Sequence, residues 1–362
     1  EDPSAHVALE TMASEDTVFI AGEVASFAKV DVKNKAREVI CEIGYDSKEK
    51  GIDGKECLII TNIGVQSPDI AQGVTQCNGT IGAGDQGMMY GYACDDTEEL
   101  MPLSISLAHK LSKRLTQVRK EGLLPYLYPD GKSQVTVAYN SQGEVLGVTD
   151  VVISAQHNAE VSVQKLRMDI EEHVIRKVIP KELLLPDVKI HINPTGRFVV
   201  GGPAGDVGLT GRKIIVDTYG GIARHGGGAF SGKDPTKVDR SAAYMARYAA
   251  KNVVAAGFCK KCEINLAYAI GIPQPVSIKI DTFGTEEIPK EIIEDTVNEV
   301  FDFSVAGIIN SLSLTKVKYK PVAAYGHFGR TDLDLPWERL DKVNILQEKA
   351  VARVAEEIYK NR

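Results

Sequence analysis

The sequence has few of the features that mark secreted, membrane-spanning or nucleic-acid-coating proteins. Its 362 residues hold 6 cysteines, which is too few for a disulfide scaffold and typical of a reducing compartment. No apolar run approaches the ~18 residues of a membrane span, and the first residues lack the basic start and apolar stretch of a signal peptide. The net charge of −7 disfavours general binding to a phosphate backbone. We therefore expect a cytoplasmic protein that binds neither nucleic acid nor a membrane.

What the chain does contain is the composition of an ordinary globular protein, with 43% hydrophobic and 25% charged residues. At ~100 to 200 residues per domain, its length predicts two or three domains. We place an N-terminal domain at residues 1–70, a loop at 71–81, a central domain at 82–200 and a C-terminal domain at 201–362.

Local patterns predict an α+β fold. Short runs rich in β-branched residues predict strands at 17–24, 57–61, 134–139, 145–154, 189–192, 213–216, 263–269 and 276–280. Apolar residues at helical spacing predict helices at 105–118, before Gly122, and at 163–178, before Pro180. Further helices are expected at 33–43, 239–256, 290–301 and 340–360. Short polar turns such as 140–143 imply antiparallel hairpins, and the hairpin-plus-helix pattern recurs about three times. This favours antiparallel or mixed sheets over a doubly wound parallel sheet.

Two glycine motifs match known nucleotide-binding patterns only in part. Residues 82–87 fit G-x-G-x-x-G, but turn formers precede them where the dinucleotide-binding motif needs a buried strand. Residues 227–233 fit G-x-x-x-x-G-K, yet Asp234 follows where a P-loop needs a Ser or Thr hydroxyl. Neither motif therefore predicts its usual function.

The segment 197–240 combines glycine with positive charge. Its 44 residues hold 11 of the 33 glycines, seven basic residues and four aspartates, a local charge of +3 in a chain of −7. Glycines let backbone N–H groups approach a ligand, and clustered cations attract an anion such as a polyphosphate. The aspartates are suited to metal ions that bridge phosphates. The alternative is a set of solvated loops with surface ion pairs, each worth about 0 to 1 kcal/mol.

Two longer segments are more specific. Residues 82–93 read GAGDQGMMYGYA, and residues 226–241 read GGGAFSGKDPTKVDRS. Both resemble the signature sequences of methionine adenosyltransferase, also called S-adenosylmethionine synthetase. The resemblance continues through residues 63–70, 129–135, 193–198, 205–213 and 324–329, so it covers nearly the whole chain.

The resemblance implies a reaction in which ATP, L-methionine and water give S-adenosylmethionine, pyrophosphate and phosphate. The methionine sulfur attacks C5′ of ATP and expels tripolyphosphate, which is then hydrolysed. A thioether carries no proton to remove, so no protein nucleophile is required. Preorganised cations and metals would stabilise the leaving group.

The resemblance also implies site residues, an assembly and cofactors. The catalytic phosphate contacts are Lys132, Arg212, Lys213, Lys233 and Lys237. Further ATP contacts are Asp130, Gly131, Thr195, Gly196, Arg197, Phe198, Asp206 and Ala229, with Phe198 stacking on adenine. Methionine contacts are Glu23, Gln66, Asp85, Asp206 and Asp239. Glu10 would bind K⁺ and Asp239 one of two Mg²⁺ ions per site. Family members form homodimers or homotetramers with shared active sites, and residues 66–79 are expected to gate the substrates.

Other interpretations of single residues stay open. Without the resemblance, Glu10 and Glu23 are ordinary surface carboxylates and Phe198 is a core residue. Family members also carry a Gly-His-Pro-Asp-Lys segment upstream of Glu1, whose His assists triphosphate departure and whose Asp binds magnesium. Either the chain was cut, the segment precedes Glu1 in a longer sequence, or this polypeptide lacks full activity. The alternative function is a catalytically impaired ATP-binding or regulatory subunit, and a P-loop phosphotransferase is disfavoured by Asp234.

Overall fold

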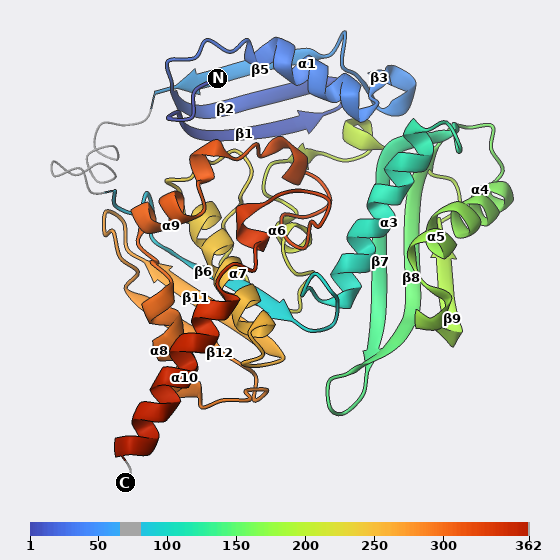
Figure 1. The fold of residues 1–362 in the computed structure, drawn as a ribbon. Coiled ribbons are helices and arrows are strands. Elements are labelled where there is room, and N and C mark those ends of the chain that lie inside the picture. The colour runs from blue at the N-terminus through green and yellow to red at the C-terminus, as the bar shows by residue number, and fades with distance from the viewer. Residues whose placement is uncertain (66–80, 361–362) are drawn as a thin grey trace.

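The computed structural model describes residues 1–65 and 81–360 and confirms the α+β fold, with three sheet-and-helix units (Figure 1). The strands are β1 (His6–Ser14), β2 (Thr17–Ala25), β3 (Asp46–Ser47), β4 (Ile52–Asp53), β5 (Leu58–Gly64), β6 (Gly87–Cys94), β7 (Leu127–Tyr139), β8 (Val145–His157), β9 (Leu184–Ile192), β10 (Gly208–Leu209), β11 (Lys261–Tyr268) and β12 (Ser277–Asp281). The helices are α1 (Val32–Ile43), α3 (Leu103–Lys120), α4 (Val163–Ile170), α5 (Arg176–Val178), α6 (Ile214–Asp217), α7 (Val238–Ala255), α8 (Lys290–Val300), α9 (Val305–Ser311) and α10 (Val343–Lys360), and Glu171–Ile175 form a π-helical turn.

The N-terminal unit is a sheet of order β10-β1-β2-β5, coloured blue in Figure 1 apart from β10. β1 pairs antiparallel with β2, and β2 pairs parallel with β5. Val18, Ile20 and Ile59 form a small separate core beneath α1. β10 comes from a segment almost 200 residues later, with Met12 opposite Leu209. The N-terminal sheet is therefore completed by the loop that carries Arg212 and Lys213.

The central unit is a sheet of order β7-β8-β9 with α3 packed on one face. The apolar stripe predicted for this helix is buried, and Leu111 and Val118 are fully enclosed. β7 and β8 form the predicted antiparallel hairpin, and β8 pairs parallel with β9. The helix predicted at 163–178 is also present, interrupted by the π-helical turn.

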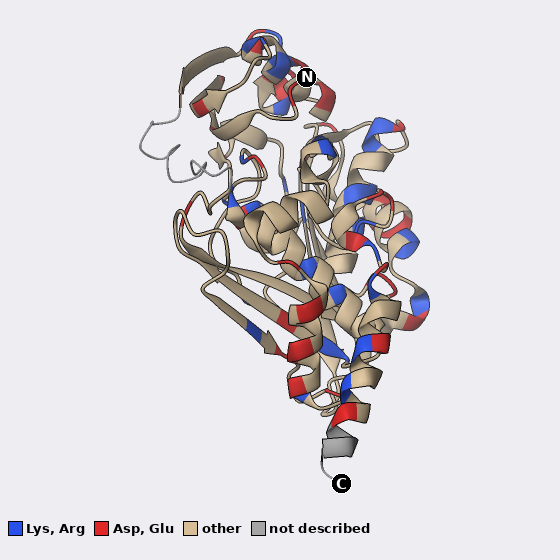
Figure 2. Ribbon diagram, turned by 60° about the vertical axis from the view of Figure 1, so that its left-hand side comes forward, with Lys and Arg blue, Asp and Glu red and all other residues tan. Residues whose placement is uncertain are grey.

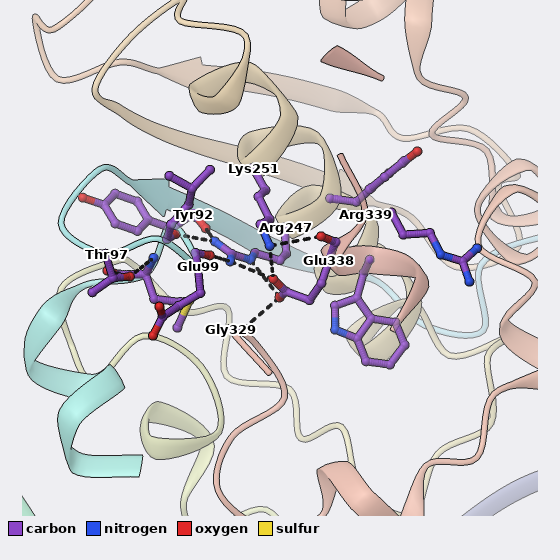
Figure 3. Close-up of polar contacts among 12 residues, drawn as sticks. Tyr92, Thr97, Glu99, Arg247, Lys251, Gly329, Glu338 and Arg339 are labelled. Carbon is purple, nitrogen blue, oxygen red and sulfur yellow. Dashed lines mark hydrogen bonds and ion pairs between the residues drawn. The ribbon is translucent and has the colours of Figure 1, made fainter. Parts of the chain in front are cut away.

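The C-terminal unit has a sheet of order β12-β11-β6, so β6 joins strands that follow it by about 170 residues. α7 lies against β6 and β11, and a Cβ at Gly91 would stand only 2.0 Å from the Ala246 carbonyl carbon. This close approach brings Arg247 of α7 into the core, where it donates hydrogen bonds to the carbonyl oxygens of Tyr92 and Leu100 (Figure 3). The glycine is therefore required for the packing of helix on sheet.

One predicted strand is wrong. Residues 214–216 lie in the short helix α6, and Lys213 is its N-cap. Their β-branched side chains favour a strand, but no neighbouring strand among the described residues pairs with them. Thr218 instead donates its hydroxyl to the Ile214 carbonyl and Asp217 its N–H to the Lys213 carbonyl, which closes a helical turn.

Charge is mixed over the molecule. Figure 2 shows basic and acidic segments interspersed over the surface elements of the molecule. Among residues 1–65 and 81–360, no helix is both long and apolar enough to cross a bilayer.

Candidate functional site

Strand β1 pairs with β2 along one edge, and along its other edge lie the two loops that carry most of the predicted phosphate-binding cations. Leu9 donates its N–H to the Gly232 carbonyl (2.9 Å), and Ala8 forms a β-bridge with Lys233. Further along the same edge, Thr11 donates its N–H to the Thr210 hydroxyl (2.8 Å). The N-terminal unit therefore fixes the backbone of both loops relative to each other.

Asp234 anchors the second signature to β1. Its carboxylate accepts hydrogen bonds from the Val7 N–H (2.8 Å) and the Thr236 N–H (2.8 Å), and pairs with Lys237 Nζ (2.5 Å). Burial acts to raise the pKa of this carboxyl, but hydrogen bonds from Lys237 and Thr236 lower it below its ordinary value. The residue that breaks the P-loop pattern thus remains ionised and holds the loop in place.

The two signatures meet beside Asp239, since a Cβ at Gly87 of the first signature would stand 3.9 Å from Asp239 Oδ1. Lys233 Nζ lies 2.6 Å from Asp239 Oδ2, with the two side chains 21% and 22% exposed. A Cβ at Gly228 would stand 2.1 Å from Asp239 Oδ1, and one at Gly226 would stand 1.5 Å from the Met88 carbonyl oxygen. Only glycine allows this approach between backbone and carboxylate. The first signature continues into β6 and not into a helix, which excludes a dinucleotide-binding turn there.

The central unit joins the site through Asp130. Its Oδ2 accepts the Gly202 N–H (2.9 Å), which ties the start of the 201–206 loop to β7. Nearby, Phe198 donates its N–H to His157 Nε2 (3.1 Å) and accepts the His157 N–H (3.0 Å). Lys132 is exposed on β7 two residues after Asp130. The predicted nucleoside segment and the strand of Lys132 are therefore neighbours.

The remaining predicted residues fall into four groups. Gly211 packs against Ala229, since a Cβ at Gly211 would stand 2.6 Å from the Ala229 Cβ, and this brings the Arg212 loop to the second signature. Exposed residues of the predicted site are Glu10, Asp85, Gly131, Thr195, Arg197, Asp206, Arg212 and Lys213. Gly196 and Glu23 are half-buried. Gln66 and the predicted gate at 66–79 lie outside the described residues.

Sequence reasoning assigned no role to Arg240, although it counted the residue among the basic ones. Its Nη1 donates to the Lys233 carbonyl (2.6 Å), and its guanidinium lies 4.3 Å from the centre of the Tyr319 ring. The neighbouring His327 is buried, shares a hydrogen bond with the Tyr244 hydroxyl (2.7 Å), and has its pKa lowered to about 3 by burial. Arg240 thus holds the Lys233 backbone through this hydrogen bond. The only sequence signal for the contact was that Arg240 follows Lys233 by seven residues.

The carboxyl of Asp217, which interacts electrostatically with Arg240, makes the stability of the fold depend on pH. Burial raises its pKa from 3.8 to about 6, and Arg240 offsets this only in part. Because the folded-state pKa is raised, Asp217 has no stability cost below about pH 4, where it is protonated in both states, and destabilises the fold as pH rises from there through about 6.

We expect Asp217→Asn to increase the free energy of unfolding by about 1 to 3 kcal/mol near pH 7.5 and to change it little near pH 4. Urea titrations of both proteins at the two pH values measure this difference. A variant less stable than the parent near pH 7.5 would contradict it.

No group of three His, Cys, Asp or Glu side chains placed to hold a metal ion occurs within residues 1–65 and 81–360. A magnesium ion bound with a polyphosphate needs only one or two carboxylates, since phosphate oxygens and waters supply its other ligands. Asp239 fits that role, because only its Oδ2 is engaged by Lys233.

A three-unit α+β protein whose glycine-rich loops gather lysines and carboxylates where the units meet is, by fold and site, a candidate polyphosphate-handling enzyme. Family comparison is more specific. The N-terminal, central and C-terminal domain models of S-adenosylmethionine synthetase match residues 1–68, 80–198 and 200–339. The chain belongs to the S-adenosylmethionine synthetase family, a family of transferases for which ATP and methionine are the implied substrates.

Proposed function

We propose that this chain makes S-adenosylmethionine from ATP, L-methionine and water, releasing tripolyphosphate that is hydrolysed to pyrophosphate and phosphate. The observation that carries the proposal is that the first signature packs against the segment that holds the Lys233–Asp239 ion pair, through Gly226 and Met88 and through Gly87 and Asp239. β1 and Asp234 hold the same loop, so the lysines of the second signature are positioned before a substrate binds.

The chemistry we propose is electrostatic. Lys233 and Lys237 each sit beside one carboxylate, which orients them in the absence of phosphate. A departing tripolyphosphate would draw both ammonium groups, together with Lys132, Arg212 and Lys213, toward its oxygens. The methionine thioether attacks C5′ directly and needs no base, so the protein's part is to align the sulfur, the carbon and the leaving oxygen.

Substrate contacts are proposed on both sides of the loop that Asp130 ties to the central unit. We assign the nucleoside to the segment 195–198 with Ala229, Asp130 and Gly131, next to the two hydrogen bonds between Phe198 and His157. We assign methionine to Glu23, Asp85, Asp206 and Asp239, with Gln66 from outside the described residues. The exposed carboxylate of Asp85 already accepts the Gln86 N–H (2.8 Å), so it is held near the start of the first signature.

Two kinds of cation belong to the proposal. Asp239 would help to hold Mg²⁺, two ions per site being expected, and Glu10 on β1 would hold K⁺. Such ions neutralise negative charge on phosphate oxygens. The Asp239 carboxylate, which already accepts a hydrogen bond from Lys233, would help to hold such an ion, and the ion would add positive charge beside the lysine.

We also propose a cytoplasmic homodimer or homotetramer with active sites shared between subunits. The sheet of β6, β11 and β12 supports this, because Met88 on β6 is 48% exposed and Phe283, just after β12, is 45% exposed.

The test is turnover by the purified chain with ATP, methionine, Mg²⁺ and K⁺. The proposal requires S-adenosylmethionine, pyrophosphate and phosphate in equal amounts. ATP binding without any product would instead indicate an impaired ATP-binding or regulatory subunit, and ADP as product would indicate a phosphotransferase.

A further inference from the structure

A cavity of about 660 Å³ lies where α1, the C-terminal end of α3, the start of β7 and the loop 320–325 meet. Figure 1 shows the upper end of α3 reaching the N-terminal unit that contains α1. Small-molecule sites commonly have volumes of about 300 to 1,000 Å³. The cavity shares only Asp130 and Gly131 with the proposed active site, and none of the five proposed catalytic cations lines it.

The walls of the cavity are mainly apolar. Ile43 comes from α1, Leu115 from α3, Leu127 and Pro129 from β7, and Pro321 from the loop. The three units therefore each contribute apolar surface to one shared space, as expected for a site that takes the apolar body of a ligand.

A guanidinium without a carboxylate partner stands at this apolar wall. Arg119 is half-buried, and its Nη2 donates to the Ile43 carbonyl (2.8 Å). Within the described residues no carboxylate lies at ion-pair distance from Arg119 or from the next residue, Lys120. By contrast, the cation of Lys320 is paired with Glu42 across the cavity rim. A half-buried cation with spare N–H donors favours a bound anion, because desolvation without a partner is costly.

Two tyrosines fix the shape of the cavity. Tyr325 has φ +66, an uncommon conformation for an aromatic residue, and its hydroxyl donates to Thr116 Oγ1 (2.8 Å). Tyr128 is held by a hydrogen bond to Glu49. Strained backbone at a cavity wall is characteristic of ligand sites, where surrounding contacts maintain it.

We propose that this cavity binds a small organic anion with an apolar, ring-containing body, whose anionic group pairs with Arg119. The proposal does not depend on the proposed catalytic function, because it rests on the cavity and its unpaired cation alone.

Fluorescence titration of the full chain with 8-anilinonaphthalene-1-sulfonate tests the proposal, since this probe joins an aromatic body to an anionic group. We expect one bound probe per chain. Arg119→Met should weaken its binding about tenfold or more, as charged hydrogen bonds contribute at this scale. Ala324→Trp, which fills the cavity from the exposed loop, should abolish binding.

Matched controls separate the anion from the apolar body. N-phenyl-1-naphthylamine lacks the sulfonate, and should bind the parent chain and Arg119→Met equally. Lys189→Met removes an exposed cation of β9 that does not line the cavity, and should leave sulfonate binding unchanged. Circular dichroism and the thermal midpoint confirm that each variant folds.

Three results would overturn the proposal. The first is no binding of the sulfonate probe to the parent chain. The second is that the folded Arg119→Met and Ala324→Trp variants bind the probe as tightly as the parent chain, and the third is full displacement of the probe by ATP.

Discussion

Lys233→Met is expected to lower the rate of S-adenosylmethionine formation by about 10²- to 10³-fold, the usual effect of removing one electrostatic contact to a developing charge. The substitution keeps most of the side-chain length and removes the ammonium group that lies 2.6 Å from Asp239. If the charge acts mainly on the departing tripolyphosphate, kcat should fall much more than the KM for ATP or methionine rises. Steady-state kinetics of both substrates measure this.

The loss of Lys233 also leaves Asp239 without its cation, so a fold control is needed. The pair is partly exposed, and we expect the thermal midpoint to change little. Lys189→Met supplies a matched control, because Lys189 is an exposed lysine on β9 away from both signatures. An unaltered kcat in a folded Lys233→Met variant would remove this residue from the mechanism.

Glu338→Ala is expected to reduce the free energy of unfolding by about 3 to 5 kcal/mol, since it would leave two buried cations without their carboxylate. Glu338 Oε2 lies 2.7 Å from Lys251 Nζ and 3.0 Å from Arg247 Nη2, while Oε1 accepts the Gly329 N–H (Figure 3). The side chains of Arg247 and Glu338 are 0% and 9% exposed. Urea unfolding at neutral pH measures the loss.

Glu299 offers a matched control because it also pairs with two cations, Lys349 and Arg353. Those side chains are 30% to 44% exposed, so solvent screens the pairs and Glu299→Ala should cost far less stability than Glu338→Ala. Equal losses for the two alanine variants would show that burial does not determine the strength of these clusters.

Local patterns were sufficient for most of the helices. The apolar stripe of α3 predicted a helix that the structure confirms at Leu103–Lys120, and the polar turn at 140–143 predicted the β7–β8 hairpin. Both depend on interactions between residues close in the chain. The strand predicted at 213–216 failed because its side chains favour β structure while no partner strand among the described residues lies beside it.

Long-range pairing was not predictable in the same way. No strand was predicted at β1 or β6, yet β1 holds both cation-bearing loops and β6 pairs with β11. The partner of β6 is β11, about 170 residues later, and a partner so distant leaves no local signal. β1 does have a local partner in β2, so what the sequence could not show is that its other edge takes up β10 and the loop at Gly232. The domain boundaries near residues 70–82 and 200 stay a prediction.

The sequence by itself determined the chemistry of this protein: the two signatures, the lysines and aspartates they carry, and through them the family. Only the tertiary structure decided which of these groups meet. It brought Asp239 of the second signature against the first, used Asp234 to fasten the loop to β1, and placed Arg240 behind Lys233. The reason is physical, because charge and glycine content are properties of single residues, whereas contact between them depends on how distant strands pair and which backbones can approach.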